Sequence, residues 1–125
     1  MAMMMQKQKA VDTVFVYGTL KKGYANHHLV QDSLYMGEFS TNEKWGLLDL
    51  GAFPAMVRGP LSVKGEAYGV DEDTLRRLDS LEGVEHGLYN RRRINVYDSL
   101  GNTISAWVYI MTAIPRDEET LTAEW

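Results

Sequence analysis

One helical segment stands among a series of strand-type segments, and this imbalance constrains the fold most. Residues 72–82 carry leucines at every third position, with Asp71 before them as a cap and Gly83 after them as a stop. The other apolar runs are short and bounded by turn-forming residues, as strands are. Many strands with one main helix predict an α+β domain built on a small curled or barrel-like sheet.

The first predicted strand is the apolar run at residues 14–17, which Gly18 closes. Such a run is typical of a buried strand that enters a tight turn. Further strands are predicted at residues 34–39, 45–50, 63–70, 93–98 and 103–111. The breaks between the middle strands are expected at Gly51, Pro54, Gly59 and Pro60, with Pro54 at an edge or a bulge. A single helical turn is predicted at residues 26–31.

The last two strands are predicted to form a hairpin around a turn at residues 99–102. The second arm alternates clearly, with Ile104, Ala106, Val108 and Ile110 on one face. In the first arm Ile94 and Val96 suit the inward face, whereas Tyr89 and Arg91 have the opposite parity. We therefore expect a bulge near Arg92 or Arg93. A short terminal helix, docked by Trp125, is predicted at residues 116–125.

The composition limits the classes of protein to consider. A chain of 125 residues is predicted to form one domain, at residues 13–125, after a disordered lead-in at residues 1–12. The net charge of −4 argues against nucleic-acid binding, and no apolar run approaches the roughly 20 residues of a membrane span. There is no cysteine, which excludes a cysteine nucleophile and agrees with a reducing compartment. We expect a cytoplasmic protein.

Glu82 is the carboxylate that helical spacing directs toward the interior. At about 100° per residue it falls between Leu75 and Leu78 on the apolar face, at the C-terminal end of the helix. Burial and the negative end of the helix dipole would both raise its pKa, which suits a general base. Two alternatives remain open: the side chain points to solvent, or it pairs structurally with an inward arginine such as Arg91.

A second candidate site is the turn Tyr17-Gly18-Thr19-Leu20, where the first strand breaks. Consecutive backbone N–H groups in such a turn can hold a carboxylate or an oxyanion, and Gly18 lets a ligand approach the backbone closely. Thr19 adds a hydroxyl donor. An ordinary turn remains the alternative.

Other site signals are weaker. His27 and His28 are adjacent, and His86 has no partner at the spacing of metal ligands, so we expect no metal site. Tyr89 and Arg91 share one face of a strand and could line a pocket, or could be a packed aromatic beside a surface charge.

The sequence resembles the gamma-glutamylcyclotransferase-like superfamily, closest to its gamma-glutamylamine cyclotransferase branch. The matching segments, in the order of that family, are residues 14–23, Asn26-His27, residues 53–57, 63–68 and 78–83, and Tyr89-Asn90-Arg91. The turn reads Gly-Thr-Leu instead of the Gly-Ser-Asn-Leu that is typical of enzymes acting on glutathione-type peptides. This departure favours the gamma-glutamylamine branch.

The resemblance implies a small mixed β-barrel with flanking short helices and a cavity at one side. It also implies substrate binding by Tyr17, Gly18, Thr19 and Leu20, catalysis by Glu82, and an aromatic contribution from Tyr89. The implied reaction needs no cofactor: the α-amine of a small gamma-glutamyl substrate attacks its own γ-carbonyl, which releases 5-oxoproline and an amine. We expect a monomer. The alternative is a binding module for a small metabolite on the same fold, without catalysis.

Overall fold

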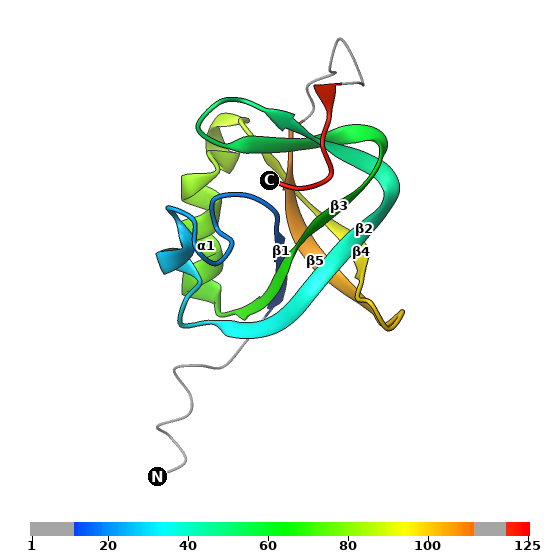
Figure 1. Cartoon of the computed structure of the whole chain (residues 1–125). Coiled ribbons are helices and arrows are strands. Elements are labelled where there is room, and N and C mark those ends of the chain that lie inside the picture. Colours follow the sequence, from blue (N-terminus) through cyan, green and yellow to red (C-terminus); the bar gives the residue numbers. More distant parts are fainter. Residues whose placement is uncertain (1–11, 112–119) are drawn as a thin grey trace.

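Five strands close into a barrel, and one helix lies beside it (Figure 1). The computed structural model describes residues 12–111 and 120–125. The strands are β1 (Asp12–Val16), β2 (Leu34–Asp49), β3 (Pro54–Val70), β4 (Asn90–Tyr97) and β5 (Thr103–Ile110). They follow the order β1-β3-β2-β4-β5, and a parallel contact between β1 and β5 closes the ring. The predicted α+β class and small mixed barrel are confirmed.

The β2–β3 hairpin is longer than the sequence patterns predicted. The segments predicted at 34–39 and 45–50 are parts of the single strand β2, and β3 begins at Pro54 rather than at residue 63. Gly59 and Pro60 therefore lie within β3 and not in a loop. The pairing of β2 with β3 shifts register between Ser40 and Gly46, where β2 is polar, and the strand continues through these shifts. Thr41 accounts for part of this continuity, because its buried hydroxyl accepts the Val63 N–H at 2.9 Å.

The hairpin of β4 and β5 was predicted correctly in its position but not in its register. The two strands pair without a shift from Asn90 and Ile110 to Tyr97 and Thr103, so the predicted bulge near Arg92 or Arg93 is wrong. No bulge is needed because the two faces of β4 pack against different parts of the molecule. Ile94 and Val96 face the barrel interior, while Arg91 faces the helix.

Two apolar layers make up the core, one inside the barrel and one between the barrel and the helix. β1 contributes to both: Phe15 and Tyr17 point inward, whereas Val14 and Val16 point outward. Burial on both faces explains why this strand reads as a continuous apolar run instead of an alternating one. The predicted buried strand is therefore confirmed, and it ends at the turn that begins with Gly18.

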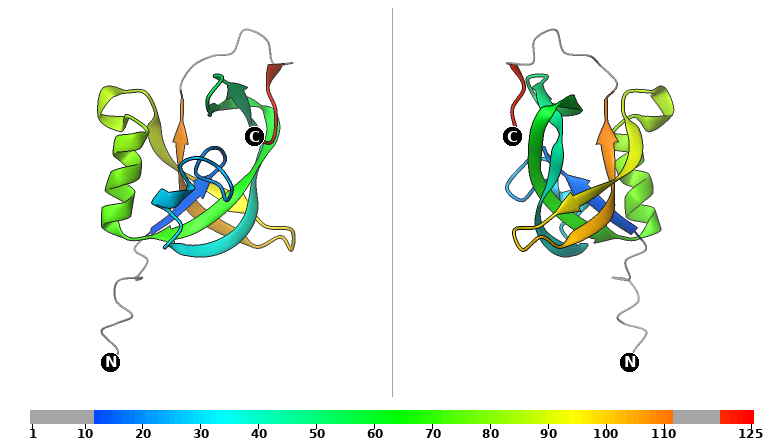
Figure 2. Two further views of the ribbon diagram at one scale, coloured as in Figure 1. Left: turned by 60° about the vertical axis from the view of Figure 1, so that its left-hand side comes forward. Right: turned by 90° about the vertical axis from the view of Figure 1, so that its right-hand side faces the viewer.

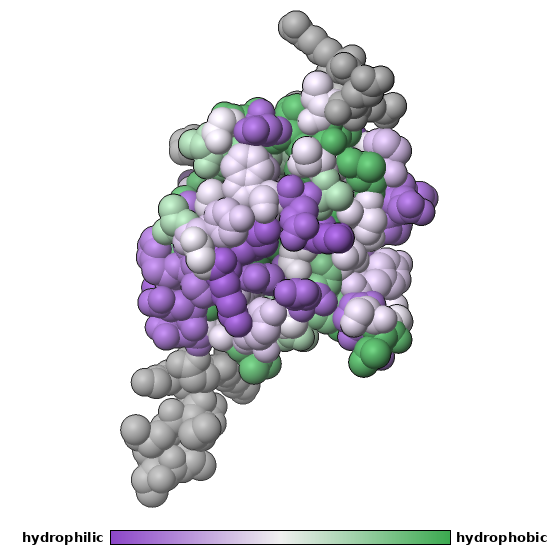
Figure 3. Space-filling view, in the orientation of Figure 1, coloured by the Kyte–Doolittle hydropathy of each residue, from purple (hydrophilic) through white to green (hydrophobic). Residues whose placement is uncertain are grey.

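The helix α1 (Glu72–Leu81) begins where it was predicted and ends one residue earlier than predicted, with Glu82 as its C-cap. Asp71 caps it by accepting the Thr74 N–H at 2.7 Å, and Gly83 follows in the left-handed region with φ of 64°. Figure 2 shows α1 beside β4 and β5, outside the barrel. Hydrophilic residues cover much of the part of the surface where Figure 1 places α1 and the short 3-10 helix η2 (His27–Leu29) (Figure 3).

A second short 3-10 helix, η3 (Val84–His86), follows α1. No helix within residues 12–111 and 120–125 is long and apolar enough to cross a membrane. Residues 1–11 of the predicted lead-in lie outside the described residues, and Asp12 opens β1.

The terminal helix predicted at residues 116–125 is wrong in its described part. Residues 116–119 lie outside the description, and Thr122 forms an isolated antiparallel bridge with Leu47 in β2. The edge of β2 that does not face β3 pairs with Thr122 at this position, and so short a segment forms a helix only weakly on its own. Trp125 does pack against the barrel core, as the sequence suggested.

Candidate active site

A cavity of about 370 Å³ opens where β1 ends, beside the C-terminal end of α1 and the tip of the β2–β3 hairpin. Its volume lies within the usual range for small-molecule sites. The lining is mostly apolar and comprises Phe15, Val16, Tyr17, Gly18, Thr19, Leu20, Ala25, Asn26, Ala52, Phe53, Pro54, Leu81, Glu82, Leu88, Tyr89 and Tyr109. All six residues predicted to form a site are in this lining, although they come from three separate parts of the chain.

Glu82 follows the last residue of α1 and contributes the one carboxylate of the described lining. Its backbone N–H donates to the Leu78 carbonyl at 2.9 Å, which continues the helical pattern and holds its side chain toward the cavity. Burial raises the pKa of the Glu82 carboxyl from its ordinary 4.5 to about 7. The predicted rise is confirmed, and burial is its cause. A carboxyl with this pKa exchanges protons near neutral pH.

The phenols around Glu82 remain protonated at neutral pH. Burial, followed by the negative charge of Glu82, raises the pKa of Tyr89 above its ordinary value. Burial likewise raises the pKa of Tyr17 and of Tyr109, and the Glu82 charge contributes to both. Of the four ionisable groups in this lining, Glu82 alone has its pKa near 7.

Arg91 does not neutralise Glu82. Its guanidinium forms a salt bridge of 3.0 Å with Asp79, and the Tyr109 hydroxyl donates to the same carboxylate at 2.8 Å. Within the described part of the chain, no basic group forms a salt bridge with Glu82. The structural pairing that the sequence left open is therefore made by Asp79, which ties α1 to β4 and β5.

The turn after β1 carries a row of unpaired donors. In the described residues, the N–H groups of Gly18, Thr19 and Leu20 have no protein acceptor, while the Gly18 carbonyl accepts the Lys21 N–H at 3.0 Å. This arrangement resembles the start of a helix, where successive free N–H groups favour an anion. The turn can therefore hold a carboxylate or a developing oxyanion chemically.

Thr19 is held by Asn26, a residue that the sequence reasoning did not assign to the site. The Asn26 side-chain amide donates to the Thr19 hydroxyl oxygen at 2.9 Å, and its backbone N–H donates to the Thr19 carbonyl at 2.9 Å. The hydroxyl hydrogen of Thr19 is left free to donate to a ligand. Asn26 belongs to one of the matching segments, and this was the available signal.

The two tyrosines at the cavity have structural hydrogen bonds. The Tyr17 hydroxyl donates to the Tyr109 carbonyl at 2.7 Å and accepts the Met56 N–H at 3.1 Å, so it ties β3 to β5. The Tyr89 hydroxyl donates to the Pro54 carbonyl at 3.0 Å. Their rings are consequently fixed as walls of the cavity, and their hydroxyls are engaged.

Gly18 is required by the packing of the hairpin tip. A Cβ at this position would lie 2.7 Å from Cγ of Pro54, which is too close for real atoms. The missing side chain lets the hairpin tip approach the turn after β1. Phe53 and Leu88 at the rim were not predicted, although exposed apolar residues in loops are a signal of a binding site.

Residues 14–125 match the family model described as gamma-glutamyl cyclotransferase, AIG2-like. The chain belongs to this family. A Vibrio cholerae protein provisionally named as a gamma-glutamylcyclotransferase is 46% identical over 97 residues, which cover 78% of this chain and 79% of that protein. The gamma-glutamylcyclotransferase family protein YtfP of Escherichia coli K12 is 35% identical over 97 residues, covering 78% and 80%.

A solved structure agrees with this membership of the gamma-glutamyl cyclotransferase family. The crystal structure of an AIG2-like protein from Mus musculus aligns with a TM-score of 0.78 and 29% identity, covering 92% of this chain and 86% of that one. The family resemblance seen in the sequence is confirmed. The family and the names of the relatives support an enzyme with gamma-glutamyl cyclotransferase activity.

In this family member, the described residues that line the cavity include one carboxylate, that of Glu82, and no histidine or aspartate. Within the described chain, no three His, Cys, Asp or Glu side chains lie close enough to share an ion. The chemistry available from the protein is a carboxyl of pKa near 7, a row of N–H donors and one hydroxyl, set in apolar walls.

Proposed function

We propose that this protein is a gamma-glutamylamine cyclotransferase that converts a gamma-glutamyl amine into 5-oxoproline and the free amine. The observation that carries this proposal is the position of Glu82 in one apolar cavity with the donor-rich turn at residues 17–20. This combination suits a small zwitterionic substrate, because the ammonium is drawn to Glu82 and the carboxylate to the N–H groups.

The proposed reaction proceeds in two steps. In the first, Glu82 removes a proton from the α-ammonium, and the free amine attacks the γ-carbonyl carbon to form the ring C–N bond. In the second, protonated Glu82 gives that proton to the nitrogen of the leaving amine, the oxyanion re-forms the carbonyl, and the original amide C–N bond breaks. Glu82 also passes the second proton from the ring nitrogen to the released amine, so the products are 5-oxoproline with one ring N–H and an ammonium. Atoms and charge balance without a further reactant. Such proton transfer contributes roughly 10²–10⁴ in rate.

The turn after β1 has the second role in this proposal. The N–H groups of Gly18, Thr19 and Leu20, with the Thr19 hydroxyl, bind the α-carboxylate or the oxyanion that forms at the γ-carbonyl. Loss of one oxyanion donor typically costs about 10²–10³ in rate. The rings of Tyr17 and Tyr89 hold the substrate in its ring-closing shape, which is a proximity effect.

The apolar rim supports an amine as the leaving group. Ala52, Phe53, Leu81 and Leu88 line the outer part of the cavity, and all four are exposed. No lysine or arginine is in the described lining. A gamma-glutamyl dipeptide would bring the carboxylate of its leaving amino acid close to the amide, where these walls offer it no cation.

A panel of gamma-glutamyl compounds tests the proposed function. The protein is incubated with gamma-glutamyl-ε-lysine, gamma-glutamyl alkylamides, gamma-glutamyl dipeptides and glutathione, and 5-oxoproline is measured by mass spectrometry. We expect product from the amides of amines at rates well above those from dipeptides. Samples without protein correct for spontaneous cyclisation.

Two results would contradict the proposal. Product from dipeptides and not from amine conjugates would overturn the choice of leaving group. No product from any compound, combined with a thermal shift on binding, would favour the binding module over the enzyme.

A further inference from the structure

The segment at residues 121–125 is bound across the outside of the β2–β3 hairpin. Leu47 and Thr122 exchange two backbone hydrogen bonds of 2.8 and 3.0 Å, and the Lys64 N–H donates to the Ala123 carbonyl at 2.8 Å. Figure 1 shows this segment in red, ending beside the loop that follows β1, and both views of Figure 2 agree. The segment thus joins the sheet to the loop of the candidate site.

Leu121 anchors the segment in a hole formed by two glycines. A Cβ at Gly46 in β2 would lie 2.8 Å from Cδ1 of Leu121, and a Cβ at Gly59 in β3 would lie 2.6 Å from the same atom. Leu121 is buried as a result. Neighbouring strands therefore give up two side chains at the place where this leucine docks, which indicates a specific contact rather than a loosely attached tail.

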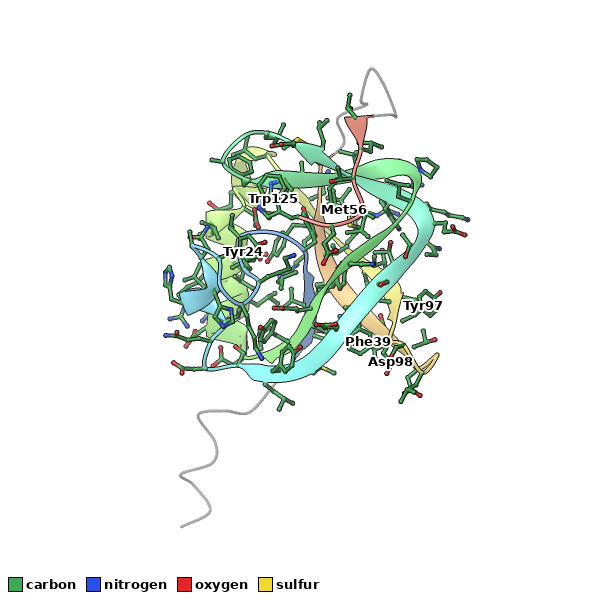
Figure 4. The ribbon with its side chains drawn as sticks, viewed as in Figure 1. Tyr24, Phe39, Met56, Tyr97, Asp98 and Trp125 are labelled. Carbon is green, nitrogen blue, oxygen red and sulfur yellow. The ribbon has the colours of Figure 1, made fainter. Side chains whose placement is uncertain are left out.

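At its other end, the segment binds the loop after β1 through Trp125. The main-chain oxygen of Trp125 accepts Nζ of Lys21 at 3.2 Å and the Tyr24 hydroxyl at 3.1 Å. Figure 4 shows Tyr24 and Trp125 beside one another. The Lys21 side chain is buried, although lysine is rarely buried without a partner. The Trp125 side chain packs on the barrel core, which fixes the position of the acceptor.

Lys21 and Tyr24 belong to the same run of turns as residues 17–20, which we propose bind the substrate. The Lys21 N–H donates to the Gly18 carbonyl, and the Tyr24 N–H donates to the Lys21 carbonyl. A continuous chain of hydrogen bonds therefore leads from Trp125 to Gly18. Because the N–H groups of residues 18–20 lack acceptors in the described protein, the shape of the turn depends on the bonds that its carbonyls accept from the N–H groups of Lys21 and Asn26.

We propose that residues 121–125 act as a clamp that holds the turn at residues 17–20 in its binding shape, with Lys21 and Tyr24 as positioning residues. This inference rests on the proposed function for its effect on substrate. The clamp reduces the conformational freedom that the turn would lose on binding, so it strengthens binding without touching the reacting atoms. Its loss raises KM more than it lowers kcat.

Three variants test the clamp: Lys21→Met, Tyr24→Phe and the double variant. Lys21→Met keeps the apolar stem and removes the donor, and Tyr24→Phe removes the other donor at an exposed position. For the double variant we expect KM to rise about tenfold with kcat within about twofold of wild type, as for a lost charge-assisted hydrogen bond. The matched control is Lys64→Met, which removes an exposed lysine beside the segment and keeps its backbone bond.

Amide hydrogen exchange provides a readout that does not depend on activity. The reporters are the N–H groups of Lys21, Tyr24 and Asn26, which are hydrogen-bonded within the turns. These N–H groups should exchange faster in the double variant than in wild type, and at the wild-type rate in the control. Unchanged exchange would overturn the clamp, and faster exchange with an unchanged KM would overturn its role in binding. Absence of product from wild type would contradict the proposed function, while exchange would still decide the clamp.

Discussion

Two carboxylates at the C-terminal end of α1 have opposite surroundings, and this difference distinguishes them at the scale of single residues. Asp79 accepts from Arg91 and from Tyr109, so its charge is satisfied by neighbours. Glu82, three residues further along, has an apolar environment that raises its pKa to about 7. The same end of the helix thus supplies one carboxylate that attaches α1 to the barrel and one that we propose for proton transfer.

Glu82→Gln should abolish most of the turnover while the fold is retained. Glutamine keeps the size of the side chain but cannot accept the ammonium proton, so we expect kcat to fall by roughly 10²–10⁴. Steady-state kinetics with a gamma-glutamyl amine measures the loss. Glu85→Gln, on an exposed glutamate three residues away, is the matched control and should behave as wild type. A Glu82→Gln variant that keeps more than about a tenth of the activity would show that Glu82 is not the base.

The rate should depend on pH through the same carboxyl. The base must be deprotonated, so kcat/KM is expected to fall about tenfold for each pH unit below about 7 and to level off above it. Initial rates at subsaturating substrate between about pH 5 and 8 give this profile, in a range where the buried phenols do not titrate. A profile that is flat across this range would contradict a catalytic role for Glu82.

At the scale of elements, the sequence predicted the helix, which local patterns determine, and missed the full length of the strands, which depends on pairing. The cap at Asp71, the stop at Gly83 and the spacing of leucines defined α1 correctly because these signals act within one helix. Strand β2 was divided in two because its polar middle looks like a loop. Only its pairing with β3 keeps it extended, and that information lies elsewhere in the chain.

The candidate site shows the same division. The helical wheel directed Glu82 inward, and the resemblance named Tyr17, Gly18, Thr19, Leu20 and Tyr89, all of which line one cavity. The wheel also placed Leu81 in the buried stripe, whereas it is 43% exposed at the rim. The rim contacts and the hydrogen bonds of Trp125 with Lys21 and Tyr24 were missed, because they depend on how distant segments meet.

Asp79→Asn should loosen the attachment of α1 to the barrel. The change removes the charge that Arg91 pairs with at 3.0 Å in a partly buried place, so we expect the free energy of unfolding to fall by about 1–2 kcal/mol. Urea denaturation measures this loss. Asp73→Asn, on the exposed face of the same helix, is the control and should change stability by less than about 0.5 kcal/mol. Equal effects of the two substitutions would contradict the anchoring role.

At the scale of the whole molecule, the barrel and its outer apolar layer hold an uncompensated carboxyl in a place that disfavours its charge. The described residues give Glu82 no salt bridge, while the pKa of Asp12 is lowered through its hydrogen bonds to Arg93 and Trp107, despite opposition from burial. Asp12 therefore stabilises the fold above its ordinary pKa of 3.8, and this contribution is lost as the pH falls below it. Glu82 has the opposite effect in a separate range of pH.

The stability of wild type should consequently decline relative to Glu82→Gln as the pH rises from about 4.5 to about 7. In this range the unfolded chain has released the Glu82 proton and the native protein retains it, so each increase in pH favours unfolding. Above about pH 7 both states are ionised and the difference becomes constant, on the order of 3 kcal/mol. Urea denaturation of both proteins at about pH 5 and pH 8 measures it, and the comparison cancels the contribution of the groups that both proteins share. Glu85→Gln should follow wild type at both values of pH. If the free energy of unfolding of wild type and of Glu82→Gln changes equally between the two pH values, the Glu82 carboxyl is not buried enough for the proposed mechanism.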